Sequence, residues 1–148
     1  LSVLRAANAL VIPVPPTVMD FSSTAAFLTM LDETLNQLAS RDLAPDLNFV
    51  RIVASKVDEN KSMQKELLLL MRQVFGLAMI RTPMKDSAEI DNVTARLMTV
   101  YEMNSPMTSK SVRDRCLTYL NGVNEEILLD VRQTWPSHVE RLRKEGHA

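Results

Sequence analysis

The sequence predicts an α/β fold with a parallel sheet, helices on both faces of the sheet and a long C-terminal helix. Ala9 to Val14 is a continuous apolar run, which is typical of a strand that a parallel sheet buries on both faces. A helical pattern separates this run from a second strand-like segment, Asn48 to Asp58, and strand–helix–strand spacing favours parallel pairing. A long helical pattern then runs from about Ser109 to Trp135, before Pro136 interrupts it.

The first half of the chain alternates between helix and strand. Residues 1 to 7 have a helical pattern, and Pro15 and Pro16 break the chain after the first strand. We expect a helix over residues 21 to 39, with Asp20 as its N-cap. Its apolar face consists of Phe27, Leu28, Leu31, Leu35 and Leu38.

The second half continues this alternation. A helix over about residues 61 to 75 is expected to end at Gly76, which suits a C-cap. Residues 77 to 80 predict a short third strand, and residues 88 to 97 predict a short helix. Three strands are few for a doubly wound sheet, in which about five or six are usual. We therefore expect the N-terminal half of the sheet to be missing.

Composition places the chain among ordinary soluble domains. It has 148 residues, 46% of them hydrophobic and 24% charged, and a net charge of −1 that gives no global attraction to nucleic acid or membrane. Its single cysteine, Cys116, excludes an internal disulfide and fits a reducing, cytoplasmic compartment. Because the chain opens at Leu1 in a helical pattern, we expect one partial domain over residues 1–148, with residues 137–148 as a polar tail.

Catalytic and metal-binding motifs are not found. The only glycines are Gly76, Gly122 and Gly146, so neither GxxxxGK[ST] nor GxGxxG occurs, and we assign no catalytic residue. His138 and His147 have no partner at ligand spacing, which argues against a metal site. Cys116 falls on the apolar stripe of the last helix, so core packing is favoured over a role as a nucleophile.

Four segments, in the correct order, resemble ParA-type plasmid partition ATPases of the RepA/SopA group, which have a deviant P-loop. They are LSVLRAANALVIPVPPTVMDFSSTAAFLTMLDETL, RIVASKVDEN, TPMKDSAEIDNVTARLMTVYEM and SVRDRCLTYLNGVNEEILLDVRQTW. The third segment contains a P-x-K-x-S-x-E-I loop, and the fourth resembles the family's C-terminal helix. The resemblance extends to about Trp135 and implies the C-terminal half of a parallel-sheet P-loop-type fold.

The resemblance implies a function in DNA segregation. Such proteins are bacterial ATPases that use ATP and Mg²⁺, dimerise on ATP, coat nucleoid DNA without sequence preference and respond to a ParB-type centromere-binding protein. The family's phosphate loop and switch motifs would lie upstream of Leu1. We therefore expect ATP and Mg²⁺ to serve the full-length protein, and the 148-residue chain alone to bind no cofactor well and to hydrolyse no ATP.

Two short segments are the candidate nucleotide contacts. Lys56 and Asp58 end a parallel strand at its carboxyl edge, and the resemblance implies that they lie near the adenine or ribose. Pro83 and Met84 belong to the loop that the family packs against the base. A solvated strand end and a plain surface loop are the alternative interpretations. For Glu89, which follows Pro83 and Met84, local capping or pairing is favoured over a role in the site.

The last helix carries the candidate DNA contacts. Its apolar residues Val112, Cys116, Leu120, Val123, Ile127 and Val131 fall within a sector of about 100°. The basic candidates are Arg113 at the edge of the outward side, Arg115 and Arg132 on that side, and Arg141, Arg143 and Lys144 beyond Pro136. Arginines without interleaved aromatic residues suit phosphate contacts, and a solvated charged face is the alternative.

A second function stays open on the sequence alone. The chain could be a non-catalytic α/β interaction or dimerisation module that uses the exposed edge of its half-sheet, because such an edge is a liability unless it is covered. The coding sequence upstream of Leu1 distinguishes the two functions: a Lys- and Gly-rich phosphate loop there supports the ATPase.

Overall fold

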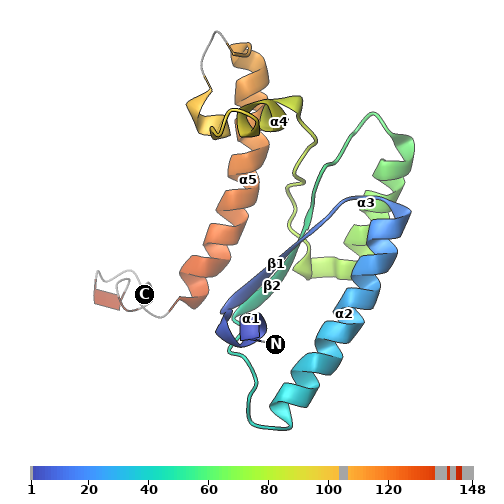
Figure 1. The fold of residues 1–148 in the computed structure, drawn as a ribbon, viewed down its shortest axis with the longest axis vertical. Coiled ribbons are helices and arrows are strands. Elements are labelled where there is room, and N and C mark those ends of the chain that lie inside the picture. Colours follow the sequence, from blue (N-terminus) through green and yellow to red (C-terminus); the bar gives the residue numbers. More distant parts are fainter. Residues whose placement is uncertain (1, 104–106, 136–139, 141–142, 145–148) are drawn as a thin grey trace.

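The computed structural model describes residues 2–103, 107–135, 140, 143 and 144 (Figure 1). Its helices and strands are α1 (Ser2–Ala6), β1 (Ala9–Val14), α2 (Val18–Ala39), β2 (Phe49–Ala54), α3 (Ser62–Phe75), α4 (Ala88–Thr94) and α5 (Lys110–Thr134). Two short 3₁₀ turns, η1 (Gly76–Ala78) and η2 (Val100–Glu102), complete the elements within these residues.

The two strands pair in parallel, as the sequence predicts. Ala9 lies opposite Phe49, and the register continues to Val14 opposite Ala54. The N–H of Ser55 donates to the carbonyl of Val14 at 3.0 Å and extends the ladder past β2. Parallel strands need a crossover connection, and α2, which lies between β1 and β2 in the chain, provides it. The predicted α/β class is confirmed.

The predicted third strand over residues 77–80 is wrong. The turn η1 takes up the first half of that range, and only Met79 bridges to β2, in parallel with Ile52. The N–H of Ile80 still donates to the carbonyl of Ile52 at 2.8 Å. The next two N–H groups, of Arg81 and Thr82, donate instead to a carboxylate on α5, so no strand ladder develops.

Helices cover both faces of the sheet. Figure 1 shows α2 and α3 on one side of β1 and β2, and α5 on the other. On the side of α2 and α3, the core is the buried cluster Val14, Ile52, Ala54, Val57, Met71 and Met79. On the side of α5, the core is Val53, Ile80 and Val123, with Met84 and Ile127 packed against them. Burial of a side chain such as Met71 contributes about 1.5–3 kcal/mol.

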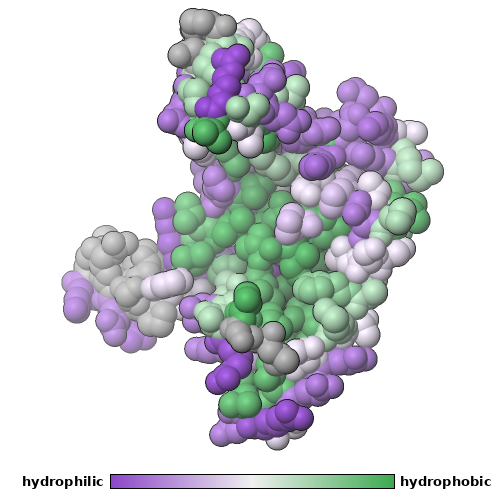
Figure 2. Space-filling view, viewed as in Figure 1, coloured by the Kyte–Doolittle hydropathy of each residue, from purple (hydrophilic) through white to green (hydrophobic). Residues whose placement is uncertain are grey.

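The strand β1 is less buried than its apolar sequence predicts. Ile12 packs against the core under α2 and α3, but Val11, on the opposite face, is 42% exposed. In Figure 2 the surface over the middle of the molecule, where the strands lie in Figure 1, is mainly hydrophobic. The prediction that β1 is buried on both faces is therefore wrong for the described residues.

Capping residues set the helix boundaries. Thr17, not Asp20, is the N-cap of α2, since its hydroxyl accepts from the N–H of Asp20 at 3.1 Å. Asp20 lies in the first turn, where its charge suits the helix dipole and its carboxylate accepts from the Thr17 hydroxyl at 2.6 Å. Gly76 ends α3 as predicted, with a positive φ of 52° that favours glycine.

Candidate functional site

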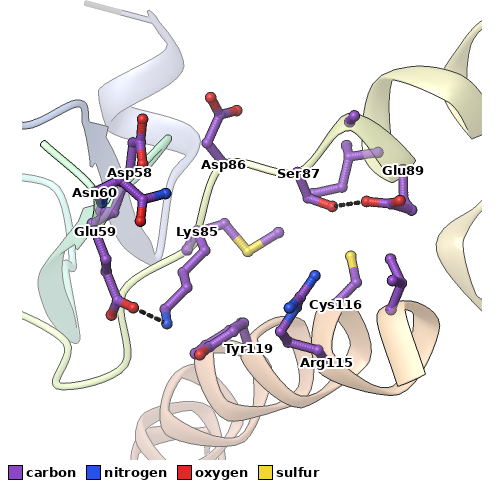
Figure 3. A pocket seen from close by; sticks show the side chains of 15 residues that line it. Asp58, Glu59, Asn60, Lys85, Asp86, Ser87, Glu89, Arg115, Cys116 and Tyr119 are labelled. Carbon is purple, nitrogen blue, oxygen red and sulfur yellow. Dashed lines mark hydrogen bonds and ion pairs between the residues drawn. The ribbon is translucent and has the colours of Figure 1, made fainter.

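A cavity of about 600 Å³ lies where the segment after β2 and the segment before α4 meet α5 (Figure 3). Three segments line it: residues 57–60, residues 84–90 and one face of α5. The α5 residues are Val112, Arg115, Cys116 and Tyr119, whose spacing places them on one helical face. The cavity is thus beyond the carboxyl end of β2, where open α/β sheets bind ligands.

Backbone hydrogen bonds hold the two loops of the cavity side by side. The N–H of Val57 donates to the carbonyl of Met84 at 3.1 Å, and the N–H of Asp86 donates to the carbonyl of Val57 at 3.0 Å. Lys85 forms a parallel bridge with Val57. The predicted nucleotide-side loop and the P-x-K loop therefore form one wall.

Asp58 and Met84 line the cavity, whereas Lys56 and Pro83 are not among its lining residues. Lys56 is exposed and has a positive φ of 51°, in the left-handed region that L residues rarely adopt. Of the four predicted nucleotide contacts, the structure brings two to the cavity. A contact with nucleotide stays a prediction for all four residues.

The carboxylate of Asp58 is held in its ionised form. It accepts from the N–H of Asn60 at 3.0 Å and lies 3.5 Å from the ammonium of Lys61. The hydrogen bond from Asn60, helped by Lys61, lowers the pKa of Asp58 below its ordinary value despite some desolvation. Asp58 therefore gives the cavity lining a negatively charged hydrogen-bond acceptor.

Lys85 connects the two loops to α5. Its ammonium pairs with the carboxylate of Glu59 and lies 4.1 Å from the centre of the Tyr119 ring, an arrangement that Figure 3 shows. Desolvation lowers the pKa of Lys85, but its interactions with Glu59 and Tyr119 outweigh this and raise the pKa above its ordinary value. Lys85 therefore stays charged and connects Glu59, in the loop after β2, to Tyr119 on α5.

Glu126 fixes to α5 the segment that comes just before the P-x-K loop. Its carboxylate accepts from the N–H of Arg81 at 2.8 Å, the N–H of Thr82 at 2.9 Å and the hydroxyl of Thr82 at 2.7 Å. Gly122 allows this close approach, since a Cβ there would lie 2.8 Å from Cγ2 of Thr82. Arg51 of β2 anchors the end of α5 through two 2.6 Å hydrogen bonds to Asp130.

A larger cavity, of about 890 Å³, lies beside these anchors and is lined by both partners of the Arg51–Asp130 pair. It borders η1 and the middle of α5, away from the carboxyl end of β2. The hydrogen bonds that Arg51 donates to Asp130 raise the pKa of Arg51, with desolvation opposing them, so these charges already satisfy one another. We therefore take the smaller cavity as the candidate site.

The predicted DNA contacts are found in different surroundings. Arg115 is exposed but lines the cavity, and the Nε of Arg113 is buried with no partner among the described residues. Arg132 is exposed in the last turn of α5, and Arg143 and Lys144 are also exposed. Arg141 lies outside the described residues. A contact with DNA stays a prediction for all six.

Other candidates have the local roles that the sequence favours. Cys116 is buried, with 6% of its surface exposed, and packs with Val93, Val100 and Met103. Glu89 accepts a hydrogen bond from the Ser87 hydroxyl at 2.7 Å. Both predictions, a core cysteine and a locally paired glutamate, are confirmed.

The sequence did not identify Glu59, Tyr119 or the cavity position of Arg115. The i, i+3, i+4, i+7 spacing of the lining residues on α5 was the available signal. Among the described residues, no group of three His, Cys, Asp or Glu side chains is placed to hold a metal. No described helix has the length and apolar character needed to span a bilayer.

Comparison with known proteins finds similar chains among partition and replication proteins. No protein-family model matches the chain. It is 24% identical over 135 residues, 91% of its length, to a "Putative replication protein A" of Rhizobium rhizogenes and equally to one of Sinorhizobium fredii. It is 25% identical over 103 residues, 69% of its length, to "Protein SopA" of Escherichia coli (strain K12).

These matches cover only part of the relatives. The chain spans 33% of the two replication proteins and 26% of SopA. Among solved structures, a "Partition Protein" superposes with a TM-score of 0.62 at 23% identity, over 86% of this chain and 31% of that one, which shows a common fold. The chain is thus similar to ParA-type partition proteins over part of their length.

Proposed function

We propose that this chain supplies the base-side half of a nucleotide site and a DNA-contacting helix to a partition ATPase. The cavity beyond the carboxyl end of β2 carries this proposal, because the loop with the P-x-K pattern and the loop after β2 both line it. The relatives named replication protein A, SopA and Partition Protein support a role in DNA partition.

The residues of the cavity fit a nucleoside. Apolar walls from Met84, Ile90 and Val112 suit a flat heterocycle, and the carboxylate of Asp58 suits a ribose hydroxyl or an amino group. The phosphates and Mg²⁺ of ATP would be held by groups that these 148 residues do not provide, since they contain no phosphate-loop motif. We therefore propose that the 148-residue chain alone turns over no ATP above the buffer background.

The outer surface of α5 and the residues after it are the proposed DNA side. Arg132 is its best-placed residue, because it is exposed and no described residue pairs with it. Arg113, Arg141, Arg143 and Lys144 are the further candidates from the sequence. Contacts with phosphates alone would give binding without sequence preference. A ParB-type partner, a homodimer and a cytoplasmic, nucleoid-bound location belong to the same proposal.

Nucleotide titration tests the site. In the protein as its gene encodes it, Tyr119→Ala should weaken binding of a fluorescent ATP analogue about fivefold or more, because an aromatic or cation–π contact is worth about 1 kcal/mol. Tyr101→Ala is the matched control: Tyr101 is half exposed, lies outside the cavity and contacts Asn121. Equal affinity of wild type and Tyr119→Ala would contradict the proposed site.

A second candidate is a non-catalytic interaction or dimerisation module, and the exposed side of β1 favours it. Val11 is 42% exposed, and among the described strands β1 pairs with β2 alone. Measurement of the molar mass of wild type and Val11→Glu by light scattering distinguishes the two. A dimer that forms without nucleotide and is lost in Val11→Glu would favour the module.

A further inference from the structure

Arg115 is the cationic group of the cavity that has no partner within the described residues. It projects from α5 toward the loop that carries Ser87, as Figure 3 shows. Lys85, the other cation in the wall, is already engaged by Glu59 and Tyr119. The Arg115 guanidinium is therefore available to a ligand in this cavity, together with the apolar side chains beside it.

The charges around Arg115 select the part of a nucleotide that fits. Four carboxylates line the cavity, those of Asp58, Glu59, Asp86 and Glu89, against the two cations Lys85 and Arg115. Lys85 pairs with Glu59, and Lys61 lies 3.5 Å from Asp58, so Arg115 is the cation of the lining that remains against the carboxylates of Asp86 and Glu89. A phosphate group would meet net repulsion here, whereas a neutral base with N–H donors would not.

We propose that Arg115 is the base-contacting residue of the cavity, with its planar guanidinium stacked on the nucleobase. Guanidinium planes stack on aromatic faces, and replacement of the protein partner of a base stack by alanine weakens binding about fivefold or more. This inference rests on the proposed nucleotide function. It assigns Arg115 to the nucleotide and removes it from the surface proposed for DNA.

Two ligands separate contact with the base from contact with phosphate. Calorimetric titration of the full-length protein with ATP and with tripolyphosphate, which has no base, compares wild type and Arg115→Ala. ATP affinity should fall about fivefold or more, since 1.4 kcal/mol corresponds to a factor of ten, while tripolyphosphate affinity should stay unchanged. Arg115→Lys should not restore ATP binding, because an ammonium has no plane to stack.

Arg96→Ala is the control, since Arg96 is exposed and does not line the cavity. An equal loss of ATP and tripolyphosphate affinity in Arg115→Ala would place the guanidinium on phosphate and overturn the inference. Unchanged ATP affinity in Arg115→Ala would overturn it while leaving the nucleotide site intact. If wild type itself binds no ATP, the proposed function fails, and this inference fails with it. Circular dichroism of each variant establishes that the fold is retained.

Discussion

The Glu126 carboxylate on α5 accepts from both the backbone N–H and the hydroxyl of Thr82, at 2.9 and 2.7 Å. The two residues are 44 positions apart in sequence, and a third hydrogen bond comes from the N–H of Arg81. This contact positions the loop that forms one wall of the candidate site. It also takes the N–H of Thr82, so the pairing of Ile80 with Ile52 does not continue to the next residue pair.

Removal of the Glu126 carboxylate should destabilise the chain. In Glu126→Ala, the partly buried N–H and hydroxyl of Thr82 and the exposed N–H of Arg81 lose their acceptor, which should cost about 1–3 kcal/mol in the free energy of unfolding. Urea denaturation measures it. Glu125→Ala, at the exposed neighbouring position, is the matched control and should change stability by less than about 0.5 kcal/mol. Equal effects of the two substitutions would contradict the anchoring role.

The contribution of Glu126 should depend on pH. Burial raises the pKa of Glu126, but the hydrogen bonds from Thr82 and Arg81 outweigh it, so the folded pKa lies below the ordinary value of 4.5. A lowered folded pKa gives stability that is fully present above the unfolded pKa and is lost as pH falls through the folded pKa. The difference in unfolding free energy between wild type and Glu126→Gln should therefore be constant near neutral pH and shrink below about pH 4.5. A difference that stays the same down to pH 3 would refute this.

Gly122 and Thr82 should be energetically coupled. A Cβ at Gly122 would lie 2.8 Å from Cγ2 of Thr82, whose hydroxyl is held by Glu126 and whose side chain therefore cannot rotate freely. Gly122→Ala should cost about 1–3 kcal/mol by overpacking, less the roughly 1 kcal/mol that alanine gains over glycine in a helix. Thr82→Ser removes Cγ2 and keeps the hydroxyl, so Gly122→Ala should be less destabilising in that background. A double-mutant cycle in urea measures the coupling, and additive effects would argue against the close contact.

Arg132 should contribute to binding of duplex DNA without regard to sequence. In the full-length protein with ATP, Arg132→Ala should lower the slope of log affinity against log salt by about one unit, because one fewer phosphate is neutralised. Anisotropy titrations on two unrelated duplexes at several salt concentrations measure this, with Lys65→Ala, an exposed cation on α3, as the control. Unchanged affinity and slope in Arg132→Ala would mean that this face of α5 is only solvated.

The helices, the two strands and their parallel pairing could be predicted from the sequence, whereas the docking of loops against α5 could not. The apolar runs identified β1 and β2 and their parallel pairing, because buried strands and crossover helices have strong local patterns. The predicted third strand over residues 77–80 failed because its first half lies in the 3₁₀ turn η1, so only Met79 and Ile80 reach β2. Glu126, far along the chain, then takes the N–H groups of Arg81 and Thr82.

The same limit applies to the site. Helical periodicity placed Arg115 relative to the apolar stripe of its own helix, but the loop opposite it depends on tertiary packing. Asp20 and Thr17 are both good N-cap residues, and only the backbone geometry shows that Thr17 takes the position. Asp58 and Met84, two of the four predicted nucleotide contacts, line the cavity because strand ends and loop position can be inferred from sequence, and their contact with nucleotide stays a prediction. Tyr119 required knowledge of where α5 docks.

Photoaffinity labelling tests the central claim, that the base of a nucleotide enters this cavity, most directly. The full-length protein would be irradiated with 8-azido-ATP, which carries its reactive group on the base, and the labelled peptides mapped by mass spectrometry. The account predicts labels within residues 57–60, 84–90 or 112–119 that excess ATP suppresses. Labels that ATP suppresses but that all map outside these three segments would contradict it.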